Sequence, residues 1–281
     1  MGILSVDVED YFHVEAFADR VDRERWHEYP TRVDENTFRV LDLLDACSVQ
    51  GTFFVLGWVA DRNPGVIHEI ARRGHEIGCH SYWHRRVFEL TRDEFRQDTL
   101  RAKQSIENAA GVSVQGYRAP SFSVVKRSWW AFEILAECGF RYDSSVFPIH
   151  HDLYGFPEAS RFPFRVDTPA GALVEFPMTT FRWLGSPNLP VGGGGYLRIF
   201  PFWLTRFGVR RALADRVPLV VYTHPWELDP DQPRIEGRFI SRLRHYTNLG
   251  KTNGRLRSLL AMARFSSFRD SGLIEALLQR R

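Results

Sequence analysis

Short apolar runs alternate with amphipathic segments along the chain, and this alternation restricts the possible folds more than any other feature. Apolar runs at residues 2–6, 51–57 and 75–78 have the length and character of buried strands. Between them, residues 34–46 and 64–73 place apolar side chains at helical spacing. Strand, helix and strand in this order predict right-handed βαβ units that build a parallel sheet. The chain is therefore expected to adopt an α/β fold.

The alternation continues through the middle of the chain. A capping-box pattern at Thr91 and Glu94 opens a helix that extends to about residue 110. After it come a short strand, a further helix and, much later, a strongly apolar final strand. These three elements are expected at residues 114–117, 127–137 and 218–222.

A long segment ahead of the final strand departs from this pattern. Residues 146–201 are rich in proline, phenylalanine and glycine, with one clear strand at 173–176 and a helix candidate at 199–214. We interpret this segment as a mostly irregular insertion over one face of the sheet.

The end of the chain differs in composition from the rest. Beyond residue 228 the sequence is polar, then basic and helical at residues 255–264 and 272–281. We expect a catalytic domain over residues 1–228 and a C-terminal helical extension, residues 229–281, packed on it.

Composition bounds the class of protein and its partners. The 281 residues are 44% hydrophobic and 25% charged, as in ordinary globular proteins. A net charge of +3 is too small to indicate a nucleic-acid partner. The three cysteines, at 47, 79 and 138, are too far apart for a Cys-x-x-Cys pair, so reduced thiols are expected.

Two further segment types are missing from the sequence pattern. No apolar run approaches the length of about 18 residues that a membrane helix needs. The chain also opens without the charged leader and apolar run of a signal peptide. We therefore expect a cytoplasmic protein with no integral membrane segment.

Two histidines four residues apart, His80 and His84, follow the run at 75–78. On one helical turn or tight loop this spacing places both side chains on the same side, where they could hold one divalent cation. The alternative is a pair of ordinary polar residues in a strand-to-helix turn. A metal site would need a third ligand, commonly a carboxylate.

Polar residues follow several of the predicted strands. In parallel α/β sheets the site lies at the carboxyl ends of the strands, so these side chains should converge on one rim. They are Asp7, Glu9 and Asp10 after the first strand, His80 and His84 after the third, Arg118, Asp143 and, after the last, His224.

Such a set would support metal-assisted hydrolysis. A carboxylate with two histidines leaves coordination positions open for water and substrate. The metal would activate the water and polarise the carbonyl under attack. A second carboxylate could take the proton from the water, and a histidine opposite could protonate the leaving amine. Arg118 would hold the basic carboxylate and keep it ionised.

The ordered motifs resemble those of the polysaccharide deacetylase superfamily (NodB homology, carbohydrate esterase family four). They are Asp7, Gly51-Thr52-Phe53-Phe54-Val55, Gly74-His75-Glu76-Ile77-Gly78, His80-Ser81-x-x-His84, Arg118-Ala119-Pro120 and Thr223-His224-Pro225. The resemblance covers roughly residues 1–228. It implies a distorted (β/α) barrel of about seven parallel strands and a divalent metal ion, most often zinc. It also implies removal of N-acetyl or O-acetyl groups from a sugar polymer or its precursor.

The resemblance assigns roles by position. Asp7 matches the catalytic base, Arg118 the arginine that orients it, and His80 and His84 the metal ligands.

The remaining roles follow in the same way. His224 matches the general acid, with Asp143 as the aspartate that pairs with it. The backbone N–H of Ser121 falls where the family stabilises the oxyanion, and Trp226 or the aromatic insertion would form the pocket for the acetyl methyl group.

The first motif departs from the usual family pattern of two adjacent aspartates, because here the run is Asp7-Val8-Glu9-Asp10. Side chains alternate along a strand, so Asp7 and Glu9 share one side. We therefore favour Glu9 as the third metal ligand. Asp10 is the alternative, and it could instead cap the following segment.

A narrower resemblance concerns the opening motif of the chain, residues 147–155 and the segment after Trp226. These look like the deacetylases associated with exosortase and exopolysaccharide gene clusters, which implies an acetylated exopolysaccharide or its lipid-linked sugar precursor as substrate. Two other functions stay open: hydrolysis of a cyclic amide, and carbohydrate binding without catalysis. The basic tail is interpreted as a solvated face or, alternatively, as a docking surface for anionic lipid or glycan.

Overall fold

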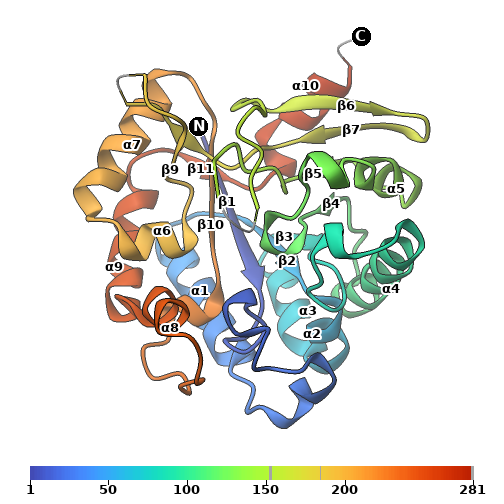
Figure 1. Ribbon diagram of the computed structural model, residues 1–281, viewed down its shortest axis with the longest axis vertical. Coiled ribbons are helices and arrows are strands. Elements are labelled where there is room, and N and C mark those ends of the chain that lie inside the picture. Colours follow the sequence, from blue (N-terminus) through green and yellow to red (C-terminus); the bar gives the residue numbers. More distant parts are fainter. Residues whose placement is uncertain (152–153, 184, 280–281) are drawn as a thin grey trace.

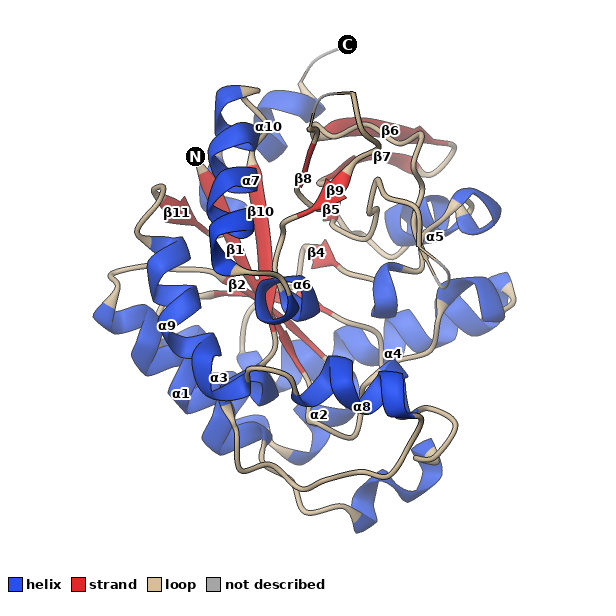
Figure 2. Ribbon diagram, turned by 60° about the vertical axis from the view of Figure 1, so that its left-hand side comes forward, coloured by secondary structure: helices blue, strands red, loops and turns tan. Residues whose placement is uncertain are grey.

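A mainly parallel sheet runs through the centre of the protein, with helices around its outside (Figure 1; Figure 2). The computed structural model describes residues 1–151, 154–183 and 185–279. Within these residues, parallel pairs join seven strands in one continuous row. Their order is β10 (Leu219–Thr223), β1 (Gly2–Val8), β2 (Thr52–Val55), β3 (Glu76–Cys79), β4 (Gly116–Tyr117), β5 (Tyr142–Asp143) and β7 (Gly171–Glu175). The predicted α/β class and its parallel sheet are confirmed.

Apart from α2, the helices of the first half lie close to their predicted ranges. They are α1 (Val33–Ala46), α2 (Gly57–Arg62), α3 (Pro64–Arg72), α4 (Arg92–Ala110) and α5 (Ala131–Glu137). The capping box that opens α4 is formed, since the Thr91 side chain accepts from the Glu94 N–H and the Glu94 carboxylate accepts from the Thr91 N–H. Gly111 ends the helix in the left-handed conformation, with φ 69°. The short helix α2 has no counterpart in the sequence prediction.

The insertion is more regular than its composition suggests. Strand β6 (Phe164–Thr168) pairs antiparallel with β7, and β8 (Thr180–Phe181) pairs with β9 (Leu189–Pro190). The helix expected over 199–214 is two helices, α6 (Gly194–Ile199) and α7 (Phe202–Ala214). The break falls at Phe200 and Pro201, because Pro201 disfavours a helical conformation in the residue before it.

Strand pairing does not close the sheet into a full barrel in the part of the chain that the structure describes. Between β7 and β10, single hydrogen bonds take the place of a ladder. The Thr179 N–H donates to the Val220 carbonyl (3.5 Å), and the Tyr222 N–H donates to the Gly192 carbonyl (2.7 Å). The expected barrel is thus present as a curved sheet whose two ends are linked by irregular chain.

The two faces of the sheet have different cores because side chains alternate along each strand. On β1, Leu4, Val6 and Val8 pack with the surrounding helices. Ile3 belongs to a second, inner cluster on the opposite face. Asp7 shares the inner face with Ile3, so strand geometry directs its carboxylate into the enclosed side of the sheet.

The C-terminal segment contributes to the same sheet. After α8 (Phe239–Tyr246) and α9 (Leu249–Leu260), strand β11 (Phe265–Ser266) pairs in parallel with the start of β1. The last helix described is α10 (Leu273–Leu278); residues 280 and 281 of the helix expected at 272–281 lie outside the described residues. The division at residue 228 stays a prediction. No described helix has the length and apolar character needed to cross a bilayer.

Glu76 of β3 joins this C-terminal segment to the sheet. Its buried carboxylate accepts hydrogen bonds from the Thr52 hydroxyl (2.6 Å), the Tyr142 hydroxyl (2.8 Å) and the Arg269 N–H (2.9 Å). The Thr52 hydroxyl in turn accepts from the Phe268 N–H (3.0 Å). Burial raises the pKa of Glu76, and the three donors oppose that increase. This residue of the sequence motif therefore has a structural role.

We predict that Glu76→Ala lowers the free energy of unfolding by about 3 kcal/mol or more, because buried donors that lose their acceptor cost about 1–3 kcal/mol each. Denaturant unfolding would measure it. Glu158→Ala is the matched control, since Glu158 is exposed and its change should stay within about 0.5 kcal/mol. Equal stability of the two variants would contradict the role of this network.

Candidate metal centre and active site

Side chains from the carboxyl ends of β1, β3 and β10 meet at one cavity of about 170 Å³. Parallel strands bring these ends to the same edge of the sheet. The residues that line the cavity are Asp7, Glu9, Val14, Glu15, His80, His84, Ala119, Ser121, Phe122, Tyr154, Tyr222, His224 and Trp226. The structure thus brings together all the residues predicted for the site except Asp10, Asp143 and Arg118, and Arg118 lies directly behind Asp7.

Glu9, His80 and His84 form a buried cluster whose potential ligand atoms all lie within 4.8 Å of one another. The Glu9 Oε2 atom is 3.1 Å from His84 Nε2, yet it accepts no hydrogen bond from the residues described. His80 Nδ1 lies 2.8 Å from the Arg118 carbonyl and, as the donor to it, leaves Nε2 free to coordinate.

The charge states of the two histidines also suit a cation. Burial lowers the pKa of His80 to about 4 and that of His84 well below its ordinary value, so both rings are neutral near pH 7. Neutral imidazoles and a carboxylate are the donor set of catalytic zinc sites. The unsatisfied oxygen of Glu9 is the atom that a cation would neutralise. The residues therefore fit a divalent metal.

The loop from His80 to His84 is held by hydrogen bonds to its backbone. The Asp98 carboxylate of α4 accepts from the Tyr82 N–H (2.8 Å) and the Trp83 N–H (3.2 Å). Ser81 and His84 adopt left-handed conformations, with φ of 63° and 51°. Such conformations cost free energy and persist where the surroundings enforce them, often at functional sites. This loop conformation, rather than a helical turn, places both rings against Glu9.

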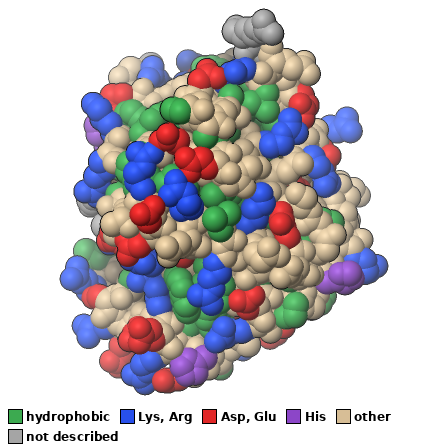
Figure 3. All heavy atoms as spheres, turned by 90° about the vertical axis from the view of Figure 1, so that its right-hand side faces the viewer, with side chains coloured by type: hydrophobic (Ala, Val, Ile, Leu, Met, Phe, Trp, Pro, Cys, Tyr) green, Lys and Arg blue, Asp and Glu red, His purple; other side chains and the backbone are tan. Residues whose placement is uncertain are grey.

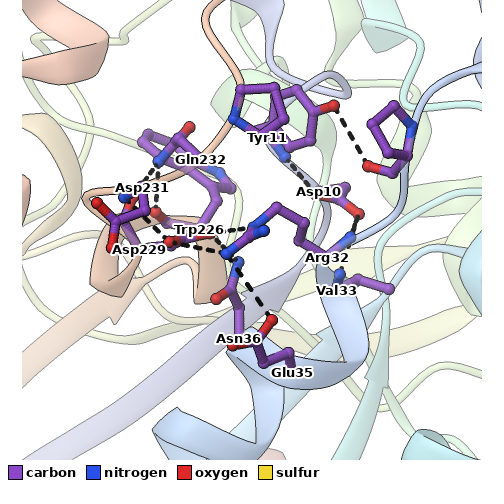
Figure 4. Close-up of polar contacts among 12 residues, drawn as sticks. Asp10, Tyr11, Arg32, Val33, Glu35, Asn36, Trp226, Asp229, Asp231 and Gln232 are labelled. Atoms are coloured by element: carbon purple, nitrogen blue, oxygen red, sulfur yellow. Dashed lines mark hydrogen bonds and ion pairs between the residues drawn. The ribbon is translucent and has the colours of Figure 1, made fainter.

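Asp10 is not part of the cluster. Its carboxylate accepts four hydrogen bonds, from the Tyr11 N–H (2.9 Å), the Thr31 hydroxyl (2.9 Å), the Arg32 N–H (2.7 Å) and the Val33 N–H (3.0 Å). Figure 4 shows it directed at Arg32 and Val33, where α1 begins. Asp10 thus caps the following segment, and the geometry favours Glu9 as the carboxylate ligand.

Asp7 pairs with the fully buried Arg118, whose Nη1 lies 2.7 Å from Asp7 Oδ1. The same guanidinium donates to Ser5 Oγ (2.7 Å), the Ser144 carbonyl (3.0 Å) and Ser144 Oγ (2.9 Å), so its position is fixed. Burial raises the pKa of Asp7, but Arg118, His80 and His224 together bring it below its ordinary value. Asp7 is therefore ionised at neutral pH.

His224 lies across the cavity from the cluster. Its Nε2 is 3.2 Å from Glu9 Oε1 and 3.9 Å from Asp7 Oδ2, while its Nδ1 hydrogen-bonds to the Glu227 carboxylate. Burial lowers the pKa of His224, and the carboxylates of Glu227, Glu9 and Asp7 more than offset this and raise it to about 9. Arg198 Nε in turn pairs with Glu227 (2.8 Å).

The expected pairing of Asp143 with His224 is wrong. The Asp143 carboxylate instead accepts from the Ser145 N–H (2.9 Å) and hydroxyl (2.7 Å). The reason is strand alternation: Tyr142 faces the inner cluster, so the next residue on β5 faces away from it. Burial raises the pKa of Asp143 to about 6, and hydrogen bonds with Glu175 and Ser145 oppose that increase.

Sequence reasoning missed Glu227 as the partner of His224. The signal was the spacing of three residues in His224-Pro225-Trp226-Glu227, because residues i and i+3 eclipse one another in a 3₁₀ turn, and Pro225–Leu228 forms such a turn. Arg198 had no comparable signal. It lies in the insertion and reaches Glu227 only through the tertiary fold.

Ser121 lines the cavity in a left-handed conformation, with φ 54° and ψ 28°. No hydrogen bond to its backbone N–H is found within the described part of the chain. The aromatic side chains of Phe122, Tyr154, Tyr222 and Trp226 form the apolar part of the cavity wall. Trp226 stacks on His224, with ring centroids 5.1 Å apart.

Comparison with known families accounts for this arrangement. Residues 26–142 match the family model described as polysaccharide deacetylase. This part of the chain is thus similar to the polysaccharide deacetylase family. Residues 144–272 match a second family model, described as a domain of unknown function, DUF3473. His80, His84 and Arg118 fall within the first match and His224 within the second, whereas Asp7 and Glu9 precede both.

Curated relatives of the deacetylase domain share part of the chain. A peptidoglycan-N-acetylglucosamine deacetylase of Bacillus cereus is 32% identical over 100 residues, which cover 35% of this chain and 36% of the relative. A peptidoglycan deacetylase of Helicobacter pylori is 29% identical over 119 residues, 41% of this chain and 37% of the relative. The chain thus spans little more than a third of these proteins.

Solved structures share the fold over almost the whole chain. A candidate polysaccharide deacetylase of Mycobacterium smegmatis aligns with a TM-score of 0.65 and 23% identity, covering 98% of this chain and 88% of that one. A pseudoenzyme of carbohydrate esterase family 4 from Bacillus anthracis aligns with a TM-score of 0.51 and 15% identity, covering 96% and 64%. Since one protein with this fold is named a pseudoenzyme, the fold alone does not establish activity, which has to be argued from the site.

We predict that the purified protein binds one Zn²⁺ ion per chain. Glu9→Ala and His84→Ala should each weaken binding by more than about 100-fold, because changes to groups outside the ligand set already cost about 10–100-fold. Asp10→Asn should still bind the ion, since its carboxylate caps α1. Elemental analysis after dialysis, with competition against a chelator, would measure this. Loss of the ion in Asp10→Asn but not in Glu9→Ala would reverse the assignment.

Proposed function

We propose that the protein is a metal-dependent hydrolase that removes N-acetyl groups from a polysaccharide or an exopolysaccharide precursor. The observation that carries the proposal is one cavity holding the Glu9–His80–His84 cluster, an ionised Asp7 and a hydrogen-bonded His224. The deacetylase domain and its relatives, named as peptidoglycan deacetylases, support this class of substrate.

Glu9, His80 and His84 would hold the metal, which we propose to be zinc. When bound, such an ion polarises the substrate carbonyl and makes a water molecule a stronger nucleophile. The three ligand residues line the same cavity as Asp7 and His224, so a substrate in the cavity would lie next to all five.

Asp7 acts as the general base. Its Oδ1 is engaged by Arg118, so Oδ2, the oxygen nearer His224, is the atom available to accept the proton of the attacking water. Arg118 keeps the carboxylate ionised before attack. Proton transfer of this kind contributes about 10²–10⁴-fold to rate.

His224 acts as the general acid. Its Nδ1–H donates to Glu227, which favours the protonated ring and directs Nε2–H into the cavity. That proton passes to the amine nitrogen as the bond to the acetyl carbon breaks. The N–H of Ser121 stabilises the negative charge on the carbonyl oxygen, and the aromatic wall with Trp226 receives the acetyl methyl group.

We predict that Asp7→Asn lowers kcat on N-acetylglucosamine oligomers by about 10²–10⁴-fold, because the amide cannot accept the proton. Bound Zn²⁺ and the melting temperature should stay close to those of the wild type, which separates loss of the base from loss of the site. Release of free amine and of acetate would both be measured. A wild-type protein that binds zinc but releases neither product would contradict the proposed activity.

We predict that Glu227→Gln lowers kcat about tenfold or more, because Glu227 supports the general acid His224. KM should change little, because Glu227 does not line the cavity. Asp143→Asn is the matched control. It is also a buried carboxylate next to the sheet edge, but it makes no contact with His224, and its kcat should remain near the wild-type value. A larger loss in Asp143→Asn would restore the pairing expected from the sequence.

A further inference from the structure

Helix α8 exposes an apolar face that nothing in the described structure covers. Phe239, Ile240 and Leu243 are 78%, 61% and 55% exposed. Their spacing of i, i+1 and i+4 places them side by side on the helix. The opposite side of the helix is packed, with His245 buried against Trp226 and Phe17.

Basic side chains border this face. Arg242 and Arg244 are the exposed neighbours of Leu243 in sequence, so they project to either side of the apolar stripe, and Arg238 precedes it. Residues 234–251 contain five arginines and lysines and one acidic residue, Glu236. An amphipathic helix with aromatic and aliphatic residues on one side and arginines at its edges is typical of helices that lie in a membrane interface.

The helix is fixed to the proposed active site. Arg198, which pairs with Glu227, also donates to the carbonyls of Arg244 (2.9 Å) and His245 (2.7 Å) at the end of α8. The His245 ring stacks on Trp226 at 4.1 Å, and Trp226 stacks on His224. Figure 1 shows α8 on the side of the sheet toward which β1 points, where the cavity opens.

The exposed apolar residue Leu100 lies in a different electrostatic setting. Leu100 of α4 is 47% exposed, but the arginines around this helix are paired with acids, Arg92 with Glu133 and Arg96 with Glu137. Figure 3, which views the molecule from the α4 side, shows blue and red side chains interspersed over that face. Around α8, Arg238 lies 3.8 Å from Asp19, but Arg242 and Arg244 have no acidic partner among the described residues, so positive charge in excess borders the apolar stripe.

We propose that α8 docks the protein on an anionic lipid bilayer, with Phe239, Ile240 and Leu243 inserted among the headgroups and Arg238, Arg242 and Arg244 on the lipid phosphates. The inference rests on the proposed function, because docking would bring the cavity to a lipid-linked sugar precursor at the membrane surface. An anionic glycan would use the arginines but has no need of three exposed apolar side chains, so lipid fits the surface better.

Cosedimentation with vesicles of phosphatidylglycerol and phosphatidylcholine tests this directly. The full chain should partition onto these vesicles, bind pure phosphatidylcholine much less, and be released as salt rises from about 0.1 M to about 1 M. Leu243→Ser should weaken partitioning about tenfold, since burying a leucine side chain is worth a factor of about ten or more. The matched control is Leu100→Ser, the same change at an exposed helical position, which should bind as the wild type does.

Three results would overturn the proposal. They are absence of binding to the anionic vesicles, equal binding by Leu243→Ser and Leu100→Ser, and a wild-type dimer in solution that Leu243→Ser turns into a monomer without effect on vesicles. Circular dichroism would show that each variant is folded. The Asp7→Asn variant should bind vesicles as the wild type does. Failure of docking and failure of the proposed activity are therefore distinguished. Vesicle binding without deacetylation refutes only the activity, and deacetylation of soluble oligomers without vesicle binding refutes only docking.

Discussion

The guanidinium group of Arg118 is buried without solvent contact, and the proposed active site depends on how that charge is satisfied. Asp7 and Ser5 on β1 and Ser144 after β5 supply its partners, while the Arg118 carbonyl accepts from His80. Removing one partner of such a buried pair typically costs about 3–5 kcal/mol. The same contacts that stabilise the inner side of the sheet therefore orient the base and one metal ligand.

A second buried arginine, Arg198, organises the opposite wall. It neutralises Glu227, which fixes His224, and it holds the end of α8 through backbone carbonyls. The proposed site is consequently assembled from both matched regions of the chain: residues 26–142 supply the histidine pair, and residues 144–272 supply the proposed acid with its support. The proposed base, Asp7 on β1, and the proposed carboxylate ligand, Glu9 just after β1, precede both regions.

The parts of the site that could be predicted from sequence are those set by local geometry. Glu9 was favoured over Asp10 because side chains alternate along a strand, and the structure places the two carboxylates as that argument requires. The pairing of Asp143 with His224 was predicted from the family resemblance alone. It does not form in the structure, because the register of β5 directs the Asp143 side chain away from the cavity. The role of Glu227 could have been predicted from its spacing of three residues from His224, whereas no sequence pattern pointed to Arg198.

The sequence by itself determined the α/β class, the order of strands and helices in the first half, and the set of polar residues at the strand ends, because periodicity and capping are local properties of the chain. Only the tertiary structure decided which acid supports His224, that the sheet is joined by irregular chain between β7 and β10, and that α8 presents its apolar face outward beside the cavity. Those outcomes depend on contacts between residues far apart in sequence, such as Arg198 with His245, and the pattern of neighbouring residues carries no information about them.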